Sequence, residues 1–371
     1  MSDPVSNTQG TRIECAASER FSAWLAEAGG SLVVTTYQAG KVALIGWDGR
    51  QISLLMRHFD KPLGLAIDGT RMALACRHEV LLFSNDPRLA HDYLADQPGR
   101  YDALFMPQAA YFTGELNTHD VMYGAGGLWL MATRFSCLAA LSDEFSFVPR
   151  WQPKFITELV PEDRCHLNGL AMREGQPNLV TALGESNQVG GWRSNKATGG
   201  VLIDVASQET VLRGLSMPHS PRWHARRLWV LNSGAGELCV IDPESGRHEV
   251  ISTLPGYLRG LCFVQDFALV GLCQIREQHI FGGLLVQERF KKLLCGIAVI
   301  DLRTGQQVGL FEFTAGCQEL YDVQFLPGVL RPNILNPQSE AARQAVSAPG
   351  FSYWLRRSSL VEDATDVGPP N

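Results

Sequence analysis

The sequence predicts an all-β protein, a six-bladed β-propeller, and three observations support this prediction. A short apolar phrase with a polar or proline-bearing lead-in recurs six times along the 371 residues. Five of the copies begin a group of four strand-like segments, which is the size of one propeller blade. The sixth copy leads into one isolated strand, and the chain starts with three isolated strands. These four strands together make one further blade and close the ring, which removes the exposed edges of an open array.

The clearest copy of the phrase is residues 165–171, and its Gly-Leu-Ala core gives the reference position Gly169. Glycine, aspartate or serine occupies this position in every copy: Gly64, Asp120, Gly169, Ser220, Gly260 and Asp322. Successive positions are 56, 49, 51, 40 and 62 residues apart. This loose period is close to that of a four-stranded blade, so six copies indicate six blades.

The expected elements follow in chain order. Apolar residues at helical spacing, Phe21, Trp24 and Leu25, predict a short helix over residues 18–28. Strands then follow, separated by turn signals such as Asp48-Gly49. The incomplete first blade has strands 32–37, 42–47 and 52–59. The complete blades have strands 63–68, 71–77, 79–85 and 101–107; 121–123, 127–134, 137–141 and 145–151; 167–172, 178–184, 200–205 and 209–215; 221–224, 228–232, 238–242 and 248–254; and 258–264, 267–273, 295–301 and 307–313. The isolated strand is 320–326.

This reading divides the chain into three parts. Residues 1–30 form an N-terminal segment with the short helix, and residues 31–328 form the propeller. Residues 329–371, which contain several prolines and few apolar runs, are expected to wrap around the body or to be disordered.

Composition limits the classes of function. The chain is 45% hydrophobic and 19% charged, and its net charge of -6 argues against binding to nucleic acid or an anionic membrane. No apolar run approaches the roughly 18 residues of a membrane span, and the first 30 residues do not resemble a signal peptide. The nine cysteines are odd in number and never spaced as CxxC, which is typical of reduced thiols. We therefore expect a cytoplasmic protein, and composition indicates no oligomeric state.

Ring closure predicts which side chains meet at one end of the central channel. The first strand of each blade should line this channel, so the residue before each repeated position, and the residue two further back, should form two rings around its mouth. The expected rings are Leu63, His119, Asn168, His219, Arg259 and Tyr321, and Lys61, Asn117, His166, Met217, Tyr257 and Glu319. Three histidines on consecutive blades are therefore expected at this mouth.

Two long loops are expected to cover the same mouth. Residues 185–199, which contain Arg193, and residues 275–294, which contain Arg276, both follow the second strand of a blade. Long loops on the face where channel residues converge are commonly lids or binding loops. We expect them to bring Arg193 or Arg276 within reach of a bound molecule.

Three interpretations of the mouth remain open. In the first, His119, His166 and His219 bind zinc, copper or iron, because neutral imidazoles suit these metals. In the second, the site is metal-free and uses acid–base chemistry: the catalytic candidates are His119, His219, Glu319 and Tyr321, and the substrate-binding candidates are Asn168, Arg259, Arg276 and Arg193. In the third, the polar residues are hydrated or structural, with Arg259 paired to Glu319 and with Asp120 or Asp322 fixing neighbouring strands.

Two classes of function follow from these interpretations. One is a cytoplasmic enzyme that acts on a small polar or anionic molecule, or on a peptide side chain, in the channel mouth. The alternative is a non-catalytic propeller that binds a metabolite or a protein segment on the same face. Fold alone does not choose between them.

Several phrases also resemble those of a known family. They are 118–120 (Thr-His-Asp), 166–171, 218–223, 231–234 with 236–238, and 274–277 (Gln-Ile-Arg-Glu). They are similar to an uncharacterised bacterial family, a domain of unknown function expected to be a propeller, and the likeness covers residues 31–328. The Asn-Gly-Leu-Ala lead-in is more distantly similar to that of the gluconolactonase and strictosidine-synthase-like six-bladed propellers. The present chain has histidines where the lactonases have oxygen-rich metal ligands, so the resemblance implies the fold and not calcium-dependent lactone hydrolysis.

Overall fold

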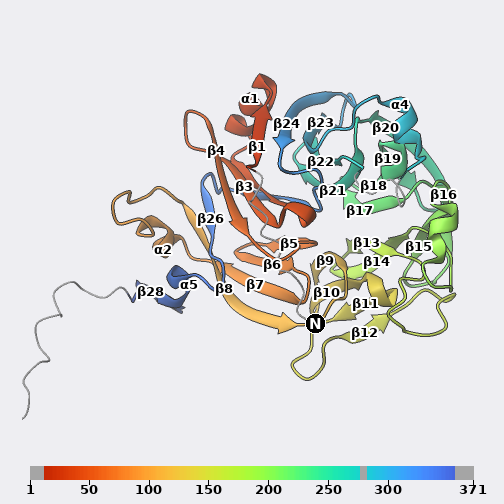
Figure 1. Ribbon diagram of the computed structural model, residues 1–371, viewed down its shortest axis with the longest axis horizontal. Helices are drawn as coiled ribbons and strands as arrows, with labels where there is room; N and C mark the ends of the chain where they lie inside the picture. The colour runs from red at the N-terminus through yellow and green to blue at the C-terminus, as the bar shows by residue number, and fades with distance from the viewer. Residues whose placement is uncertain (1–11, 276–281, 356–371) are drawn as a thin grey trace, which may run out of the picture.

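Six sheets surround a central axis in the computed structural model, which describes residues 12–275 and 282–355 (Figure 1). We number the blades 1 to 6 and give the strands of each from the innermost outward. Blade 1 has β25 (Val323–Pro327), β2 (Gly30–Thr35), β3 (Lys41–Trp47) and β4 (Ile52–His58). Blade 2 has β5 (Leu65–Asp68), β6 (Arg71–Ala75), β7 (Glu79–Asn85) and β8 (Ala103–Phe112). Blade 3 has β9 (Thr118–Gly124), β10 (Gly127–Ala132), β11 (Cys137–Ala140) and β12 (Val148–Trp151). Blade 4 has β13 (Leu167–Arg173), β14 (Gln176–Ala182), β15 (Gly200–Asp204) and β16 (Thr210–Leu215). Blade 5 has β17 (Pro218–His224), β18 (Arg227–Asn232), β19 (Glu237–Asp242) and β20 (Arg247–Thr253). Blade 6 has β21 (Tyr257–Val264), β22 (Phe267–Cys273), β23 (Gly296–Asp301) and β24 (Gln307–Ala315).

The ring closes as the strand count predicts. β25, from the C-terminal part of the chain, pairs antiparallel with β2, with Leu32 opposite Phe325 and Val34 opposite Val323. β25 is therefore the innermost strand of the blade whose other strands are β2, β3 and β4. The six-bladed fold and its mode of closure are confirmed.

Burial is greater in the inner strands of a blade than in its outermost strand. β2 and β23 are buried along their whole length, and both consist mainly of apolar residues. β20, an outer strand with the sequence RHEVIST, is largely exposed. This gradient follows because inner strands are covered on both faces by neighbouring blades, whereas outer strands face water.

Two short strands extend the propeller beyond its expected limits of 31 and 328. β1 (Glu14–Ala17) pairs antiparallel with β24, and β26 (Pro332–Ile334) pairs parallel with β8. Each covers the outer edge of a blade, which would otherwise expose unpaired backbone groups. The described part of the tail is ordered, since α5 (Glu340–Gln344) and the hairpin of β27 (Ala345–Ala348) and β28 (Phe351–Trp354) follow β26. Trp354 donates to Leu89 O of α2 (Pro87–His91) at 3.2 Å.

The expected helix is α1 (Glu19–Glu27). Ser18 caps it, because its hydroxyl accepts from the backbone N–H of Phe21 at 3.1 Å. Phe21 and Leu25 are fully buried, and the Phe21 ring lies 5.6 Å from the ring of Phe311 in β24. Within residues 12–275 and 282–355, no helix has the length and apolar composition to cross a bilayer.

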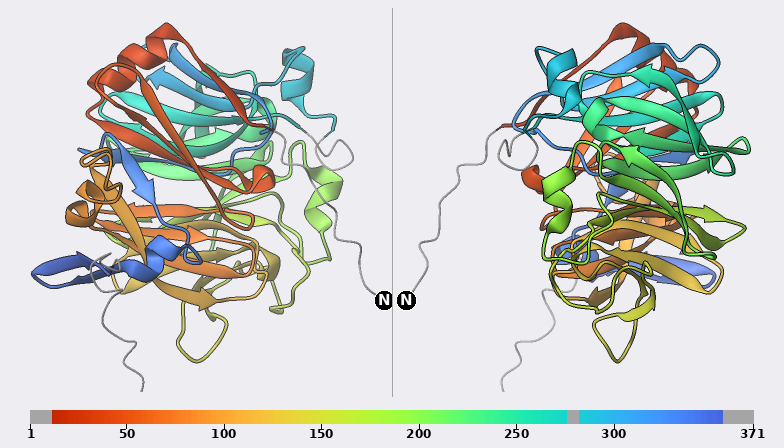
Figure 2. Two further views of the ribbon diagram at one scale, coloured as in Figure 1. Left: turned by 60° about the vertical axis from the view of Figure 1, so that its left-hand side comes forward. Right: turned by 90° about the vertical axis from the view of Figure 1, so that its right-hand side faces the viewer.

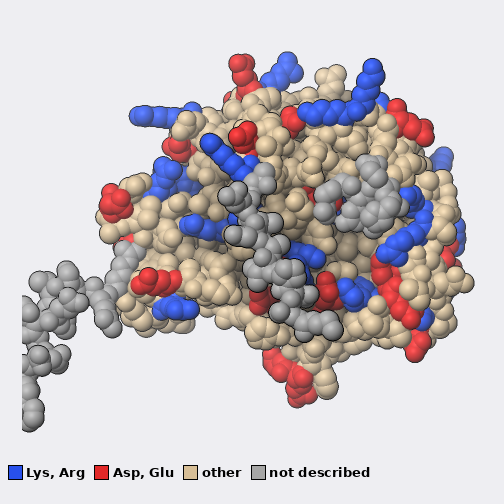
Figure 3. All heavy atoms as spheres, in the orientation of Figure 1, with Lys and Arg blue, Asp and Glu red and all other residues tan. Residues whose placement is uncertain are grey.

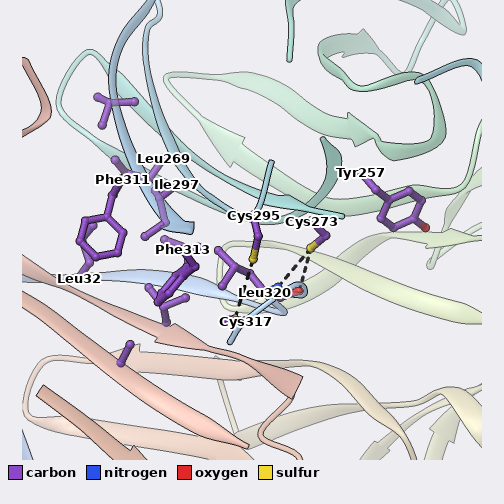
Figure 4. Close-up of a cluster of buried hydrophobic side chains, with 14 of the residues drawn as sticks. Leu32, Tyr257, Leu269, Cys273, Cys295, Ile297, Phe311, Phe313, Cys317 and Leu320 are labelled. Carbon is purple, nitrogen blue, oxygen red and sulfur yellow. Dashed lines mark hydrogen bonds between the residues drawn. The ribbon is translucent and has the colours of Figure 1, made fainter. Parts of the chain in front are cut away.

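An apolar cluster with three cysteines joins the last blade to the closing strand (Figure 4). The Cys273 thiol lies 3.1 Å from the carbonyl oxygen and 3.3 Å from the amide nitrogen of Leu320, which leads into β25. Cys295 and Cys317 are buried with their sulfur atoms 3.9 Å apart. The thiols here pack as small apolar groups.

The repeated position alternates between two kinds of residue around the ring. In every second blade it is polar, and its side chain accepts a hydrogen bond from the inner strand of the next blade. These bonds run from Leu65 N to Asp322 Oδ2 at 3.0 Å, from Leu170 N to Asp120 Oδ2 at 3.0 Å, and from Gly260 N to Ser220 Oγ at 3.2 Å. Asp120 and Asp322 therefore do fix neighbouring strands.

The other three blades have glycine at this position because the next strand approaches too closely for a side chain. A Cβ on Gly64 would lie 3.0 Å from Asp120 Cα, and one on Gly260 would lie 2.7 Å from Val323 N. A Cβ on Gly169 would lie 2.4 Å from Pro221 Cδ. Each blade with a polar residue at the repeated position therefore hydrogen-bonds to the next blade, and each blade with glycine at this position packs closely against the next. Three such pairs of blades complete the ring.

Arg222 of β17 forms a buried ion pair with Asp120 of β9, two blades away. Its two terminal nitrogens donate to the two carboxylate oxygens at 2.8 and 3.0 Å, and Nη1 also donates to Leu170 O at 2.9 Å. Such bidentate, charge-assisted bonds are strong and directional. Burial raises the pKa of the nearby Asp322 to about 7, with Arg222 opposing the shift and Asp120 adding to it.

Replacing Asp120 by alanine tests this ion pair. The change leaves Arg222 buried without its carboxylate, and we expect a loss of about 3–5 kcal/mol in the free energy of unfolding, measured with urea. The matched control is Asp68→Ala, which removes the partner of Arg71 in an exposed pair and should cost less than about 1 kcal/mol. Equal losses in the two variants would contradict the assigned role of Asp120.

Asp322 should make stability depend on pH. Its folded pKa of about 7 lies above the unfolded value of roughly 3.9, so the native state binds more protons between these values. The free energy of unfolding contributed by this group therefore falls as pH rises from about 4 to 7. Asp322→Asn should lose this dependence, so its stability relative to the native chain should rise across that window in urea titrations. Parallel curves for the two proteins would show that Asp322 does not titrate there.

Candidate functional site

Left-handed turns carry the chain into four of the inner strands. Four residues of the second expected ring have positive φ angles: Lys61 (45°), Asn117 (52°), His166 (51°) and Met217 (48°). We expected the two rings to face the channel together because residues two apart in a strand point to the same side. This expectation is wrong for these four positions, because the period of two applies only to extended backbone. The turn also has a use, since it brings a backbone carbonyl next to the side chain two residues later.

The mouth contains a cavity of about 170 Å³. Residues from both expected rings line it, together with residues of neighbouring turns. The lining residues are Tyr37, Leu63, Asn117, His119, Asp163, His166, Trp192, Arg193, Arg259, Glu319 and Tyr321.

His119 is held in one tautomer by its own turn. Its Nδ1 lies 2.7 Å from Asn117 O, and because a carbonyl only accepts, Nδ1 carries the proton and Nε2 carries the lone pair. Removal of the ring from water lowers the pKa of His119 well below 6.5, and the neighbouring His166 lowers it further. The ring centres of His119 and His166 are 4.6 Å apart in an edge-on contact.

His166 is oriented by a carboxylate. Its Nδ1 lies 2.8 Å from Asp163 Oδ2, and Trp192 Nε1 donates to the same oxygen at 3.1 Å. The Trp192 ring also lies 4.6 Å from the His166 ring. Asp163 therefore connects the histidine of blade 4 to the loop that covers it.

His219 repeats the geometry of His119 but does not line the cavity. Its Nδ1 donates to Met217 O at 2.9 Å, with Ser233 Oγ at 3.1 Å, and its ring packs 5.6 Å from that of Tyr257. Burial, followed by the charge of Arg259, lowers the pKa of His219 well below 6.5. His219 is 5% exposed, and its Nε2 has no hydrogen-bond partner among the residues that the structure describes.

Arg259 lies between two tyrosine rings at the floor of the mouth. Its guanidinium carbon is 5.3 Å from the ring centre of Tyr257 and 5.0 Å from that of Tyr321. Glu319, also buried, lines the same cavity. Burial raises the pKa of Tyr321 well above 10, and its hydroxyl has no hydrogen-bond partner within residues 12–275 and 282–355.

The two long loops lie on one side of the propeller (Figure 2). The 3₁₀ turn η3 (Gly191–Asn195) of loop 185–199 places Trp192 and Arg193 in the cavity wall. In the other loop, α4 (Leu285–Arg289) is tied to blade 5, because Arg289 donates to Glu237 Oε1 at 2.6 Å and to Ala235 O at 2.8 Å. α4 does not line the cavity, and the candidate Arg276 lies outside the described residues.

The structure brings most of the candidate residues together. The cavity wall contains His119, His166, Glu319, Tyr321, Arg259 and Arg193. His219 and Asn168 are not part of it. Asn168, expected to contact a substrate, instead donates to Pro218 O at 2.9 Å and accepts from Thr181 Oγ1 at 2.7 Å. Its amide therefore holds blade 4 against blade 5.

The geometry does not support the three-histidine metal hypothesis. Among residues 12–275 and 282–355, no three His, Cys, Asp or Glu side chains converge as a metal site requires. His119 and His166 touch, but His219 lies against Tyr257 outside the cavity.

Two residues of the wall were missed from the sequence. Asp163 precedes His166 by three residues and has a left-handed φ of 50°, so the chain folds back and brings the carboxylate to the ring. Tyr37 follows β2, and its ring lies 5.7 Å from that of Tyr321. The sequence spacing Asp-x-x-His directly before an inner strand could have indicated that Asp163 lies next to His166.

Comparisons with known proteins identify a family and a fold. The model of a family described as "Domain of unknown function (DUF4915)" matches residues 19–335. No match was found among curated proteins. A chain in a crystal structure of a nidogen/laminin complex is similar, with a TM-score of 0.52 and 10% identity over 81% of this chain and 99% of that chain. A protein of unknown function from Bacteroides caccae has a TM-score of 0.50 and 10% identity over 80% and 99% of the two chains. At this identity the likeness shows the fold alone.

Asp163→Asn tests whether the carboxylate anchors the covering loop. The change weakens the bonds from His166 and Trp192, and a charged hydrogen bond contributes about 1.5–3 kcal/mol, so amide exchange in residues 185–199 should accelerate by about 10- to 100-fold. Hydrogen–deuterium exchange with mass spectrometry measures this. The control is Glu158→Gln, whose exposed carboxylate lies 3.7 Å from Arg164. Unchanged protection in Asp163→Asn would show that other contacts hold the loop.

Proposed function

The chain belongs to the DUF4915 family, and we propose that its channel mouth is the active site of an enzyme that acts on a small anionic molecule by acid–base chemistry. The observation that carries this proposal is that Arg259 and His119 line one cavity, with Nδ1 of His119 bonded to Asn117 O and the pKa of His119 lowered by burial. The expected likeness to gluconolactonase and strictosidine-synthase-like propellers adds no reaction to it.

Arg259 is the proposed anion-binding group. A guanidinium presents a planar set of N–H donors that matches a carboxylate or a phosphate. The tyrosine rings on either side fix its plane. Its attraction for an anion is strengthened because the site is withdrawn from water. The face of the molecule in Figure 3 has both acidic and basic side chains, so we assign the selectivity for an anion to Arg259 and not to a basic face.

His119 is the proposed base. Its Nδ1–H is committed to Asn117 O, and its lowered pKa keeps Nε2 unprotonated at neutral pH. His166, in contact with His119, is oriented by its hydrogen bond to Asp163. Tyr321 provides a hydroxyl that is available to donate to a developing negative charge on the substrate.

The cavity sets the size of the substrate. Its volume of about 170 Å³ is close to the 150 Å³ cavity that accommodates benzene and below the ~300–1,000 Å³ of drug-sized sites. We expect a molecule of about six to ten non-hydrogen atoms.

A second candidate function is binding without chemistry. The rings of Tyr37, Trp192 and Tyr321 form a large part of the wall, and aromatic surfaces of this kind hold a ligand by contact alone. In that case the mouth would serve as a metabolite receptor. The two candidates differ in whether the bound molecule is changed.

The binding half of the proposal is tested with Arg259→Lys. Thermal shift assays with a panel of small carboxylates and phosphates should find at least one that stabilises the native chain, and the variant should bind it at least tenfold more weakly, since lysine lacks the bidentate fork. The control is Arg227→Lys, an exposed residue paired with Glu249. Binding that is equal in both variants, or no binding of any anion, would contradict the proposal.

The catalytic half is tested with His119→Asn. The asparagine amide can still donate to Asn117 O but removes Nε2, so kcat with the identified ligand should fall by about 10²–10⁴ with little change in affinity. Because the pKa of His119 is lowered, the acid limb of kcat/KM should lie below pH 6.5. Unchanged kcat in the variant would exclude His119 as the base, and a ligand that binds but is never turned over would establish the receptor function instead.

A further inference from the structure

The hydrogen-bonding groups of the mouth restrict the chemistry of the bound molecule more closely than its charge does. All three histidines have Nδ1 next to an acceptor: Asn117 O at 2.7 Å, Met217 O at 2.9 Å and Asp163 Oδ2 at 2.8 Å. Carbonyl and carboxylate oxygens accept hydrogen bonds, so each Nδ1 is the donor, and in a neutral ring Nε2 is then an acceptor. The imidazole of His119, which lines the cavity, therefore requires a hydrogen-bond donor on the ligand.

Nε2 of His119 does not easily become a donor. Desolvation lowers the pKa of His119 well below 6.5, and the neighbouring His166 and the charge of Arg259 lower it further. The carboxylate of Glu319 adds a further acceptor to the cavity wall. One part of the wall therefore accepts hydrogen bonds, and the ligand must bring N–H or O–H groups to it.

The other part of the wall donates. Arg259 offers its guanidinium, and Tyr321 offers a hydroxyl with no partner among the described residues. A matching ligand has an anionic group for these donors and a donor group for the acceptors. Both groups lie in a cavity of about 170 Å³, so they belong to one small molecule and are separated by only a few bonds.

An ammonium group fits the accepting part better than a hydroxyl does. It supplies three N–H donors from one atom, whereas a hydroxyl supplies one. Aromatic faces in the wall also attract cations, and the Lys61 ammonium already lies 5.6 Å from the ring centre of Tyr37. Arg259 and Glu319 carry opposite charges in the same wall, so a ligand that brings one negative and one positive group can meet both.

Burial favours a ligand whose charges cancel. Transfer of an unpaired ion out of water is costly, whereas opposite charges that are each paired and hydrogen-bonded are tolerated. A zwitterion satisfies this condition, with its anion on Arg259 and its cation near Glu319 and His119. From these observations we infer that the mouth binds a small α-amino acid, with the carboxylate on Arg259 and the ammonium group on the accepting side formed by His119 and Glu319. This inference rests on the proposed function and specifies its substrate class.

The test uses three matched sets of ligands that differ in a single group. Isothermal titration calorimetry with the full chain compares alanine with lactate and propionate, leucine with 2-hydroxy-4-methylpentanoate and 4-methylpentanoate, and glutamate with 2-hydroxyglutarate and glutarate. In at least one set, the amino acid should bind at least tenfold more tightly than the hydroxy acid and at least a hundredfold more tightly than the simple acid. The remaining common amino acids are then screened in the same way.

Variants show whether the preference arises in this cavity. Glu319→Gln should reduce the preference for the amino acid over the hydroxy acid at least fivefold, while Arg259→Lys should weaken all three members of a set. Tyr321→Phe, which removes only a hydroxyl, should weaken carboxylate binding at least threefold. It provides a readout even if Arg259→Lys fails to fold. Arg227→Lys is the unchanged control.

The possible failures are distinguishable. If hydroxy acids or simple acids bind as well as amino acids in an Arg259-dependent way, the inference is overturned and the proposed anion site stands. If none of the common amino acids binds while another anion does, the result is the same. If no anion binds at all, the proposed function fails together with the inference.

Discussion

The close approach of the six inner strands at the repeated position is the constraint on which the rest of the molecule depends. Glycine at Gly64, Gly169 and Gly260 allows the approach, and the polar residue of each following blade bonds onward to the next. A side chain at a glycine position would separate two blades, and loss of a polar side chain would leave a buried amide without its acceptor. The blades thus form three interlocked pairs, and closure by β25 joins the last pair to the first.

This narrow axis also determines where a small molecule can bind. Arg222 and Asp120 form a buried ion pair between inner strands, and separate cavities lie at the two ends of these strands. The mouth at the start of the inner strands is a cavity of about 170 Å³ with polar groups directed by the left-handed turns. The opposite end is a wider and more open depression of about 580 Å³, lined by the last residues of the same strands. The orientation of His119 and His219 follows from the left-handed turns before their strands. In blades 3 and 5, the same turn places a backbone carbonyl against the imidazole two residues later.

The fold was predictable from the sequence because a six-fold repeat and a strand count are properties of the chain itself. The helix over 18–28 was predictable from the spacing of its apolar residues. The repeat also predicted most of the residues that line the mouth. Other features depend on contacts that the repeat does not encode. Lys61 and Met217 have left-handed backbone conformations that neither residue type favours, and the strands β1 and β26 are too short to show a period. Asn168 occupies the same ring position as His119, yet it serves as a bridge because Pro218 O and Thr181 Oγ1 lie within reach of its amide.

The proposed site requires His119 to be neutral and to present Nε2 as an acceptor. The most direct measurement is ¹⁵N NMR of the chain labelled at its histidine ring nitrogens, with His119→Asn and His219→Asn used to assign the signals. At pH 7 we expect a protonated Nδ1 and an unprotonated Nε2 for His119, and the same for the buried His219, with no imidazolium until the pH falls below 6.5. An Nε2–H tautomer or an imidazolium of His119 at pH 7 would remove both the base and the histidine acceptor of the site.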